Sequence, residues 1–155
     1  DVSNAMSNPL KATKFGLPFR HVPTYLAGYY KYKAGDQFTE GGKPVNGKRD
    51  ICDIYAIMYE TSESVPTLDG TNAFTSPNLI STARINNAKE TNEWTYFKLP
   101  FTTLPGKFID KEKLMDGKYN IAIVFTSSLE GDHFNGAIGS TLLIDEAELI
   151  YHSED

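Results

Sequence analysis

The chain has 155 residues, of which 40% are hydrophobic and 23% are charged, a composition typical of one ordinary globular domain rather than a disordered segment. Its formal net charge of −5 argues against nucleic acids and anionic membrane surfaces as partners, because clustered lysine and arginine side chains bind their phosphates. Cys52 is the only cysteine, which excludes an intramolecular disulfide, and no apolar run is long enough to suggest a membrane span.

The first half of the chain contains two predicted strands. Residues 23–33 alternate between one face with Leu26, Tyr30 and Tyr32 and another with Tyr29 and lysines. Residues 51–60 are apolar on both faces, which predicts a strand in the middle of a sheet with its outer face covered or used. Its Cys52 belongs to the core face and is interpreted as an inert buried thiol. The segment between the two strands is predicted to be a loop rich in glycine and charge.

The second half continues with short runs of β-branched and aromatic residues between polar loops and turn dipeptides. The closing run carries many apolar residues and few strand breakers, so we expect it to be a central strand. The predicted elements are a long loop at 61–78, strands at 79–85, 93–101, 118–126 and 142–151, and one helical turn at 110–116. Because amphipathic helices are lacking, an antiparallel sandwich or barrel is favoured over an α/β fold.

Three segments together resemble a known family. They are Phe15-Gly16-Leu17-Pro18-Phe19 with its continuation to Gly35, then Trp94–Phe101, then Ser127–Tyr151. The chain resembles the putative carbohydrate metabolism domain, which is found at the C-terminus of exported proteins of glycan-degrading bacteria. This resemblance implies an all-β, antiparallel β-sandwich of jelly-roll type, similar to carbohydrate-binding modules, on an extracellular, cell-surface or periplasmic protein. It implies no catalytic residue.

The length of the chain and the lack of a linker-like segment predict one domain. Residues 1–155 are treated as a single β-sandwich domain. The family domain usually has more strand-forming sequence before Phe15 than residues 1–14 offer. We therefore expect an exposed sheet edge that pairs with a strand or domain of the parent protein, or with a second copy of the chain.

Aromatic side chains are the first candidates for sugar binding, because the C–H faces of sugars stack on flat rings. The chain has nine Tyr, nine Phe and one Trp, and most of these rings must belong to the core. Trp94 either plugs the sandwich or lies at its rim, and the plug is the favoured interpretation, since a lone tryptophan is more often packed than displayed. The rings assigned to the core by their alternation are Tyr30, Tyr32, Phe97, Phe101 and Phe125.

Four tyrosines are predicted to face away from that core, namely Tyr29, Tyr55, Tyr59 and Tyr96, and they form either a ligand platform or edge packing. Arg84 could donate hydrogen bonds to sugar hydroxyls or a uronate, although an ion pair with Asp53 or Glu93 is the simpler interpretation.

The loop before the closing strand supplies the remaining candidates. Asp132, His133 and Asn135 cluster between glycines, where they could bind a ligand or simply satisfy turn backbone. Neither a cofactor nor a metal is expected, because calcium requires about six or more oxygen ligands and the acidic residues here are sparse. Zinc is disfavoured by one cysteine and scattered histidines.

The sequence contains no motif of a catalytic nucleophile or phosphate loop. Asp145 could pair with Glu146 or Glu148 in glycoside hydrolysis, but in a regular strand Asp145 faces away from both. The favoured function is therefore a non-catalytic, glycan-binding module. A structural or adhesin-like accessory domain without a sugar site is the alternative, and a glycoside hydrolase is the least favoured.

Overall fold

The computed structural model describes residues 14–15, 17–19, 22–62, 68–69, 74–86, 88–130 and 134–151. Strands dominate these residues, and α3 (Lys111–Met115) occupies the predicted helical segment. Asp110 caps α3 by accepting a hydrogen bond from the backbone N–H of Glu112 at 2.8 Å. No helix in the described part of the chain has the length and apolar character needed to cross a membrane. The predicted all-β class is confirmed.

The larger sheet is antiparallel and has five strands. Their order is β10 (Thr102–Thr103), β8 (Leu79–Arg84), β6 (Asp53–Glu60), β11 (Tyr119–Thr126) and β2 (Leu17–Phe19). The central strand β6 pairs with β11 and β8, and all of its residues except Glu60 are buried. The prediction of a mid-sheet strand at this position is confirmed.

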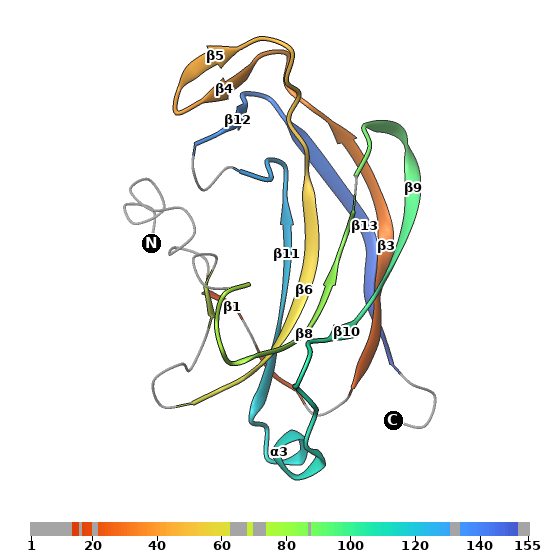
Figure 1. The fold of residues 1–155 in the computed structure, drawn as a ribbon. Helices are drawn as coiled ribbons and strands as arrows, with labels where there is room; N and C mark the ends of the chain where they lie inside the picture. The colour runs from red at the N-terminus through yellow and green to blue at the C-terminus, as the bar shows by residue number, and fades with distance from the viewer. Residues whose placement is uncertain are drawn as a thin grey trace.

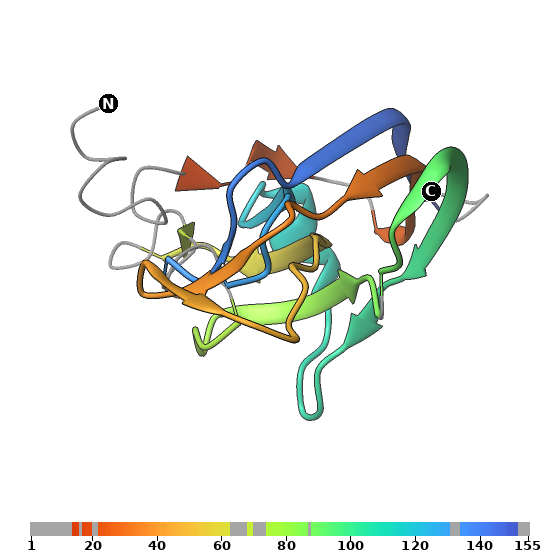
Figure 2. The same ribbon diagram turned by 90° about the horizontal axis from the view of Figure 1, so that it is seen from above.

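The smaller sheet is also antiparallel and has β3 (Pro23–Lys33) between β13 (Thr141–Tyr151) and β9 (Thr91–Pro100). The two sheets form the layers of a sandwich (Figures 1 and 2). Because β9 contacts β8, the opposite strand β13 lies on the β11 side of the sandwich. The expectation that the closing strand is central is wrong: among the described residues β13 lies at the edge of its sheet, and all of its residues are exposed or half-buried.

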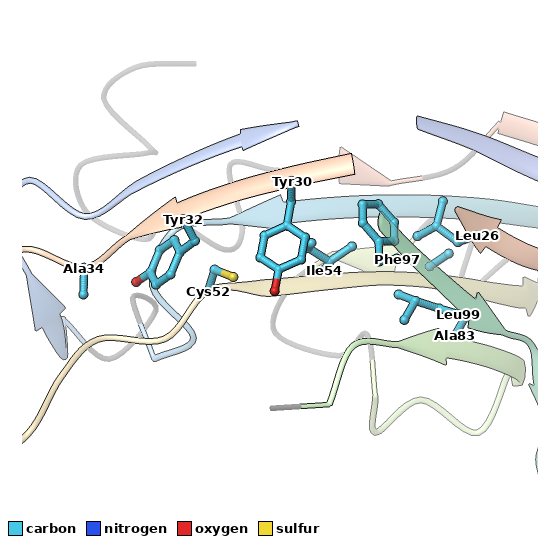
Figure 3. Close-up of a cluster of buried hydrophobic side chains, with 10 residues drawn as sticks. Leu26, Tyr30, Tyr32, Ala34, Cys52, Ile54, Ala83, Phe97 and Leu99 are labelled. Carbon is cyan, nitrogen blue, oxygen red and sulfur yellow. The ribbon is translucent and has the colours of Figure 1, made fainter. Parts of the chain in front are cut away.

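The core between the layers contains the inward faces of β3, β6 and β9 (Figure 3). Tyr30, Tyr32 and Phe97 are buried as predicted, and the Tyr32 hydroxyl donates to the Ser127 carbonyl at 2.7 Å. Burying each such ring contributes about 1.5–3 kcal/mol, so these side chains stabilise the contact between the layers. Phe101 is partly buried against the same cluster.

A β-bulge interrupts β13 where it passes Gly28. Asp145 pairs with Tyr29 and Glu148 pairs with Ala27, so two residues of β13 oppose the single residue Gly28. The first of the two, Glu146, has a positive φ of 52°. The extra residue reverses the alternation of β13, and Asp145 and Glu148 consequently lie on the same outer face. The expectation that they face opposite ways holds only for a regular strand and is wrong here.

One end of the sandwich carries a small three-stranded sheet of β12 (Gly136–Ala137), β4 (Phe38–Glu40) and β5 (Lys43–Val45). The segment predicted to be a loop therefore contains a β-hairpin. Gly41 and Gly42 connect β4 to β5 with φ values of 56° and 84°, as a type I′ turn requires.

The buried carboxylate of Asp50 fixes this end to the rest of the sandwich. One of its oxygens, Oδ2, accepts hydrogen bonds from the Ser128 hydroxyl, from the Ala137 N–H at 3.0 Å and from the Ser140 hydroxyl at 2.7 Å. Elsewhere, β1 (Lys14–Phe15) and β7 (Leu68–Asp69) form a separate antiparallel pair, and β1 contacts β11.

Candidate functional site

The outer face of the three-stranded sheet displays a row of aromatic rings. Tyr29 of β3 and Tyr96 of β9 are cross-strand partners, so they share this face. Trp94 is two residues before Tyr96 on the same strand and follows the same alternation. The exposed fractions are 36% for Tyr29, 53% for Tyr96 and 45% for Trp94. We call these three residues, together with Tyr25, the aromatic face.

The rings of the aromatic face contact one another and two lysines. The centroids of Tyr29 and Tyr96 are 5.3 Å apart, with an angle of 54° between the ring planes. The Lys31 ammonium lies 4.7 Å from the Trp94 ring centroid, and the Lys98 ammonium lies 4.3 Å from that of Tyr25. The interpretation of Trp94 as a plug is wrong, because its position on β9 directs it away from the core.

Beside the aromatic face is an open cavity of about 550 Å³. Lys31 lies over the Trp94 ring and also lines the cavity, so the cavity adjoins the aromatic face. Its lining residues are Lys31, Tyr32, Lys33, Glu90, Thr91, Asn92, Thr141 and Leu143.

Among the described residues, Glu90 is the one acidic side chain in the lining of this cavity, and its charge is already compensated by Arg49. Its carboxylate accepts two hydrogen bonds from the Arg49 guanidinium, at 2.8 and 2.7 Å, and one from the Ala34 N–H at 2.8 Å. These bonds, led by the two from Arg49, lower the pKa of Glu90 to about 2.

Two of the predicted platform tyrosines are buried on the other sheet. Tyr55 is 7% exposed and Tyr59 is 0% exposed, so the expectation that they face water is wrong. The physical reason is that loop residues cover the outer face of the five-stranded sheet. The Phe74 ring lies 4.8 Å from that of Tyr55, and Leu104 packs against the cluster that contains both tyrosines.

Arg84 lies on that same outer face, away from Tyr29 and Tyr96. It forms two hydrogen bonds with the buried carboxylate of Asp53, at 3.2 and 2.7 Å. Its guanidinium also lies 4.4 Å from the centroid of the Phe74 ring. The simpler interpretation, an ion pair with Asp53, is confirmed, and the structure does not bring Arg84 into the aromatic face.

The loop candidates divide into described and undescribed residues. Asp132 and His133 lie outside the described residues. The Asn135 side-chain oxygen accepts a hydrogen bond from the Gly41 N–H at 2.9 Å, which ties this loop to the β4–β5 hairpin. Asn135 therefore accepts a hydrogen bond from the backbone of a turn, which was the second of its two interpretations.

Metal-binding and thiol chemistry have little support in the described residues. No group of three or more His, Cys, Asp or Glu side chains among them could hold a metal ion. Cys52 is 2% exposed, and burial raises the pKa of its thiol to about 11. The prediction that this thiol is buried is confirmed.

Sequence reasoning missed Trp94, Lys31, Lys98 and Tyr25 as members of one surface. A usable signal was present for Trp94, because its spacing from Tyr96 places both rings on one face of a strand. For the lysines, the sequence shows only that Lys31 shares a strand face with Tyr29 and Lys98 shares one with Tyr96. Their positions over rings depend on cross-strand register, which the sequence does not reveal.

Comparison with known proteins identifies the family. The sequence profile of the putative carbohydrate metabolism domain matches residues 1–150. The chain belongs to this family. No curated protein matches it.

Two solved structures are similar to the chain. One is the crystal structure of a "putative glycoside hydrolase" from Bacteroides thetaiotaomicron, 89% identical, with a TM-score of 0.95. The other is the crystal structure of a "putative glycoside hydrolase" from Bacteroides vulgatus, 47% identical, with a TM-score of 0.90. They cover 99% and 98% of this chain, which spans only 45% and 61% of their respective lengths.

Proposed function

We propose that the protein is a non-catalytic glycan-binding module, and that the aromatic face is its binding surface. The observation that carries this proposal is the exposure of Trp94, Tyr96 and Tyr29 side by side on one sheet. Membership of a carbohydrate-related family supports the class of ligand. The family resemblance also leads us to propose an extracellular, cell-surface or periplasmic location.

The chemistry of the aromatic face suits sugar rings. Tyrosine and tryptophan offer large, rigid contact area and lose little conformational entropy on binding, because each has only two side-chain torsions. The tyrosine hydroxyls and the adjacent lysine ammonium groups can form hydrogen bonds with sugar hydroxyls. The side chains project from paired strands rather than loops, which keeps the rings in place before a ligand arrives.

A glycan array followed by calorimetric titration tests the proposal. Trp94→Ala and Tyr96→Ala should each weaken binding about tenfold or more, equivalent to ~1.4 kcal/mol. Phe108→Ala is the matched control, because Phe108 is 72% exposed but lies outside the aromatic face. All three variants should unfold at the wild-type temperature. If no plant, host or microbial polysaccharide binds, or if Trp94→Ala and Tyr96→Ala bind like the control, the proposal is wrong.

A glycoside hydrolase is the least favoured candidate, and one feature of β13 supports it. The bulge places Asp145 and Glu148 on the same outer face, beside Tyr29 and Ala27. Both carboxylates are exposed, whereas the general acid of such enzymes usually occupies an apolar pocket. Release of reducing sugar by the wild type, and its loss in Glu148→Gln, would establish hydrolysis and replace the binding proposal.

A structural role is the first alternative to glycan binding, and the open side of the sandwich favours it. β2 pairs with β11 only as far as Ile121, and β13 has no second neighbouring strand among the described residues. Between these edges, Ile123 and Phe125 of β11 face the interlayer side but are 40% and 37% exposed. The assignment of Phe125 to the core is therefore wrong, because nothing in the described part of the chain covers it sufficiently.

We propose that a strand from further polypeptide of the parent protein closes this open side. The greater length of the two similar structures supports this occupant. In a longer protein, the β13 amides should exchange with solvent more slowly than in this chain, because the added strand would accept their hydrogen bonds. Phe125→Ser should destabilise only the longer protein, because only there would the Phe125 ring be fully covered. Unchanged exchange would contradict the proposal, and a dimer of this chain would indicate a second copy instead.

A further inference from the structure

Three lysines with no ion-pair partner among the described residues flank the aromatic face. Lys31, Lys33 and Lys98 all belong to the outer side of the three-stranded sheet. None of them forms an ion pair within 4.0 Å among the described residues, where the four observed pairs use other cations. In a chain with a net charge of −5, three such lysines on one face are a distinct local feature.

Two of these lysines contact rings instead of carboxylates. Lys31 lies over Trp94 and Lys98 lies over Tyr25. Such contacts are weak where water has access, so a bound anion can readily replace or supplement them. The ammonium groups therefore lie beside the rings on which a sugar would stack, and they remain available to an anionic group of that sugar.

The cavity next to Trp94 extends this positive region. Its volume of about 550 Å³ is in the range of ligand pockets, roughly 300–1,000 Å³. Lys31 and Lys33 line it together with the amide of Asn92. Lys33 contributes to the low pKa of Glu90, but that carboxylate is held mainly by Arg49, which leaves the lysine ammonium open to a ligand.

We infer that the aromatic face binds glycans that carry an anionic group, a carboxylate or a sulfate, and that Lys31 and Lys33 receive this group in the adjoining cavity. The inference rests on the proposed glycan-binding function. Neighbouring sugar rings lie over Trp94 and Tyr96. Asp145 and Glu148 on β13 repel anions, but they lie farther along the strand from the cavity than Leu143, which lines it. Their charge therefore favours binding of the anionic group at the cavity end of the aromatic face.

Matched pairs of oligosaccharides test the inference by calorimetric titration. One pair is an oligogalacturonide and its fully methyl-esterified form, and the other is a sulfated galactan oligosaccharide and its desulfated form. The charged member of at least one pair should bind about tenfold more tightly than its neutral partner, and added salt should reduce the difference. The pair that shows the effect identifies the anionic group as a carboxylate or a sulfate.

Lysine variants locate the anion contact. Lys31→Gln and Lys33→Gln should each weaken binding of the charged oligosaccharide about fivefold, and the double variant about 25-fold, with little effect on the neutral partner. Lys43→Gln, which removes the same charge from exposed strand β5, should have no effect. Equal affinity for charged and neutral members overturns this inference but leaves the proposed function standing. Failure of every oligosaccharide to bind overturns both.

Discussion

The carboxylate of Asp50 offers a sharp test of what holds one end of the sandwich together. Asp50→Asn keeps the shape of the side chain but removes its charge. If the amide oxygen replaces Oδ2, its bonds with Ser128, Ala137 and Ser140 change from charge-assisted to neutral. Each of these three bonds loses about 1 kcal/mol, so together they should lower the free energy of unfolding by about 3 kcal/mol. The amide nitrogen then replaces Oδ1 and cannot accept the hydrogen bond that the Ile51 N–H donates at 3.0 Å, which adds to the loss. For a domain of this length, the melting temperature should fall by about 6–12 °C.

Urea denaturation followed by circular dichroism measures this change directly. Asp36→Asn is the matched control, because Asp36 is exposed and its substitution should alter stability by less than about 0.5 kcal/mol. Ser140→Ala, alone and combined with Asp50→Asn, measures the coupling between the two side chains, expected to be about 1 kcal/mol. A loss of less than about 1 kcal/mol in Asp50→Asn would refute the assigned role of this carboxylate.

Three further predictions follow from single contacts. Arg49→Gln should raise the pKa of Glu90 from about 2 toward 4.5, as read from its carboxyl carbon by NMR, and an unchanged value would contradict the pairing. Gly28→Ala should lower the free energy of unfolding by about 1–3 kcal/mol, because the new Cβ would lie 2.8 Å from Cζ of buried Phe97. An unchanged free energy of unfolding would show that the Phe97 ring has room to move. Burial raises the pKa of Tyr32 to about 12 in the folded protein, so the free energy of unfolding should fall as the pH rises from 10 to 12, where the unfolded chain ionises first. In Tyr32→Phe the free energy of unfolding should decline less over this window. Equal slopes for the two proteins would exclude Tyr32 as the cause.

The aromatic face shows how far a sequence pattern can lead toward a site. Tyr29 and Tyr96 were predicted to face outward because alternation along a strand is a local property, and both are exposed. The same argument placed Tyr55 and Tyr59 outward on their strand, which is also geometrically correct. Loop residues Phe74 and Leu104 nevertheless cover that face, and their arrival there depends on tertiary packing.

The β-bulge shows the limit of alternation itself. One extra residue opposite Gly28 places Asp145 and Glu148 on the same face, although their spacing in a regular strand would separate them. No residue at this position signals the bulge in the sequence, because Glu146 is not among the residues that favour a positive φ.

The amino-acid sequence alone determined where the main strands lie and which faces of β3 and β6 are apolar, because these depend on neighbours a few positions apart. The strand pattern indicated an antiparallel sandwich or barrel, and the family resemblance favoured the sandwich. Tertiary structure alone decided that β13 lies at an edge, that Phe125 is incompletely covered and that Trp94 stands beside Lys31. Those outcomes depend on register and on which residues from distant parts of the chain meet. A repeating pattern of side chains specifies the faces of a strand, but only the packed sandwich specifies which faces remain in water.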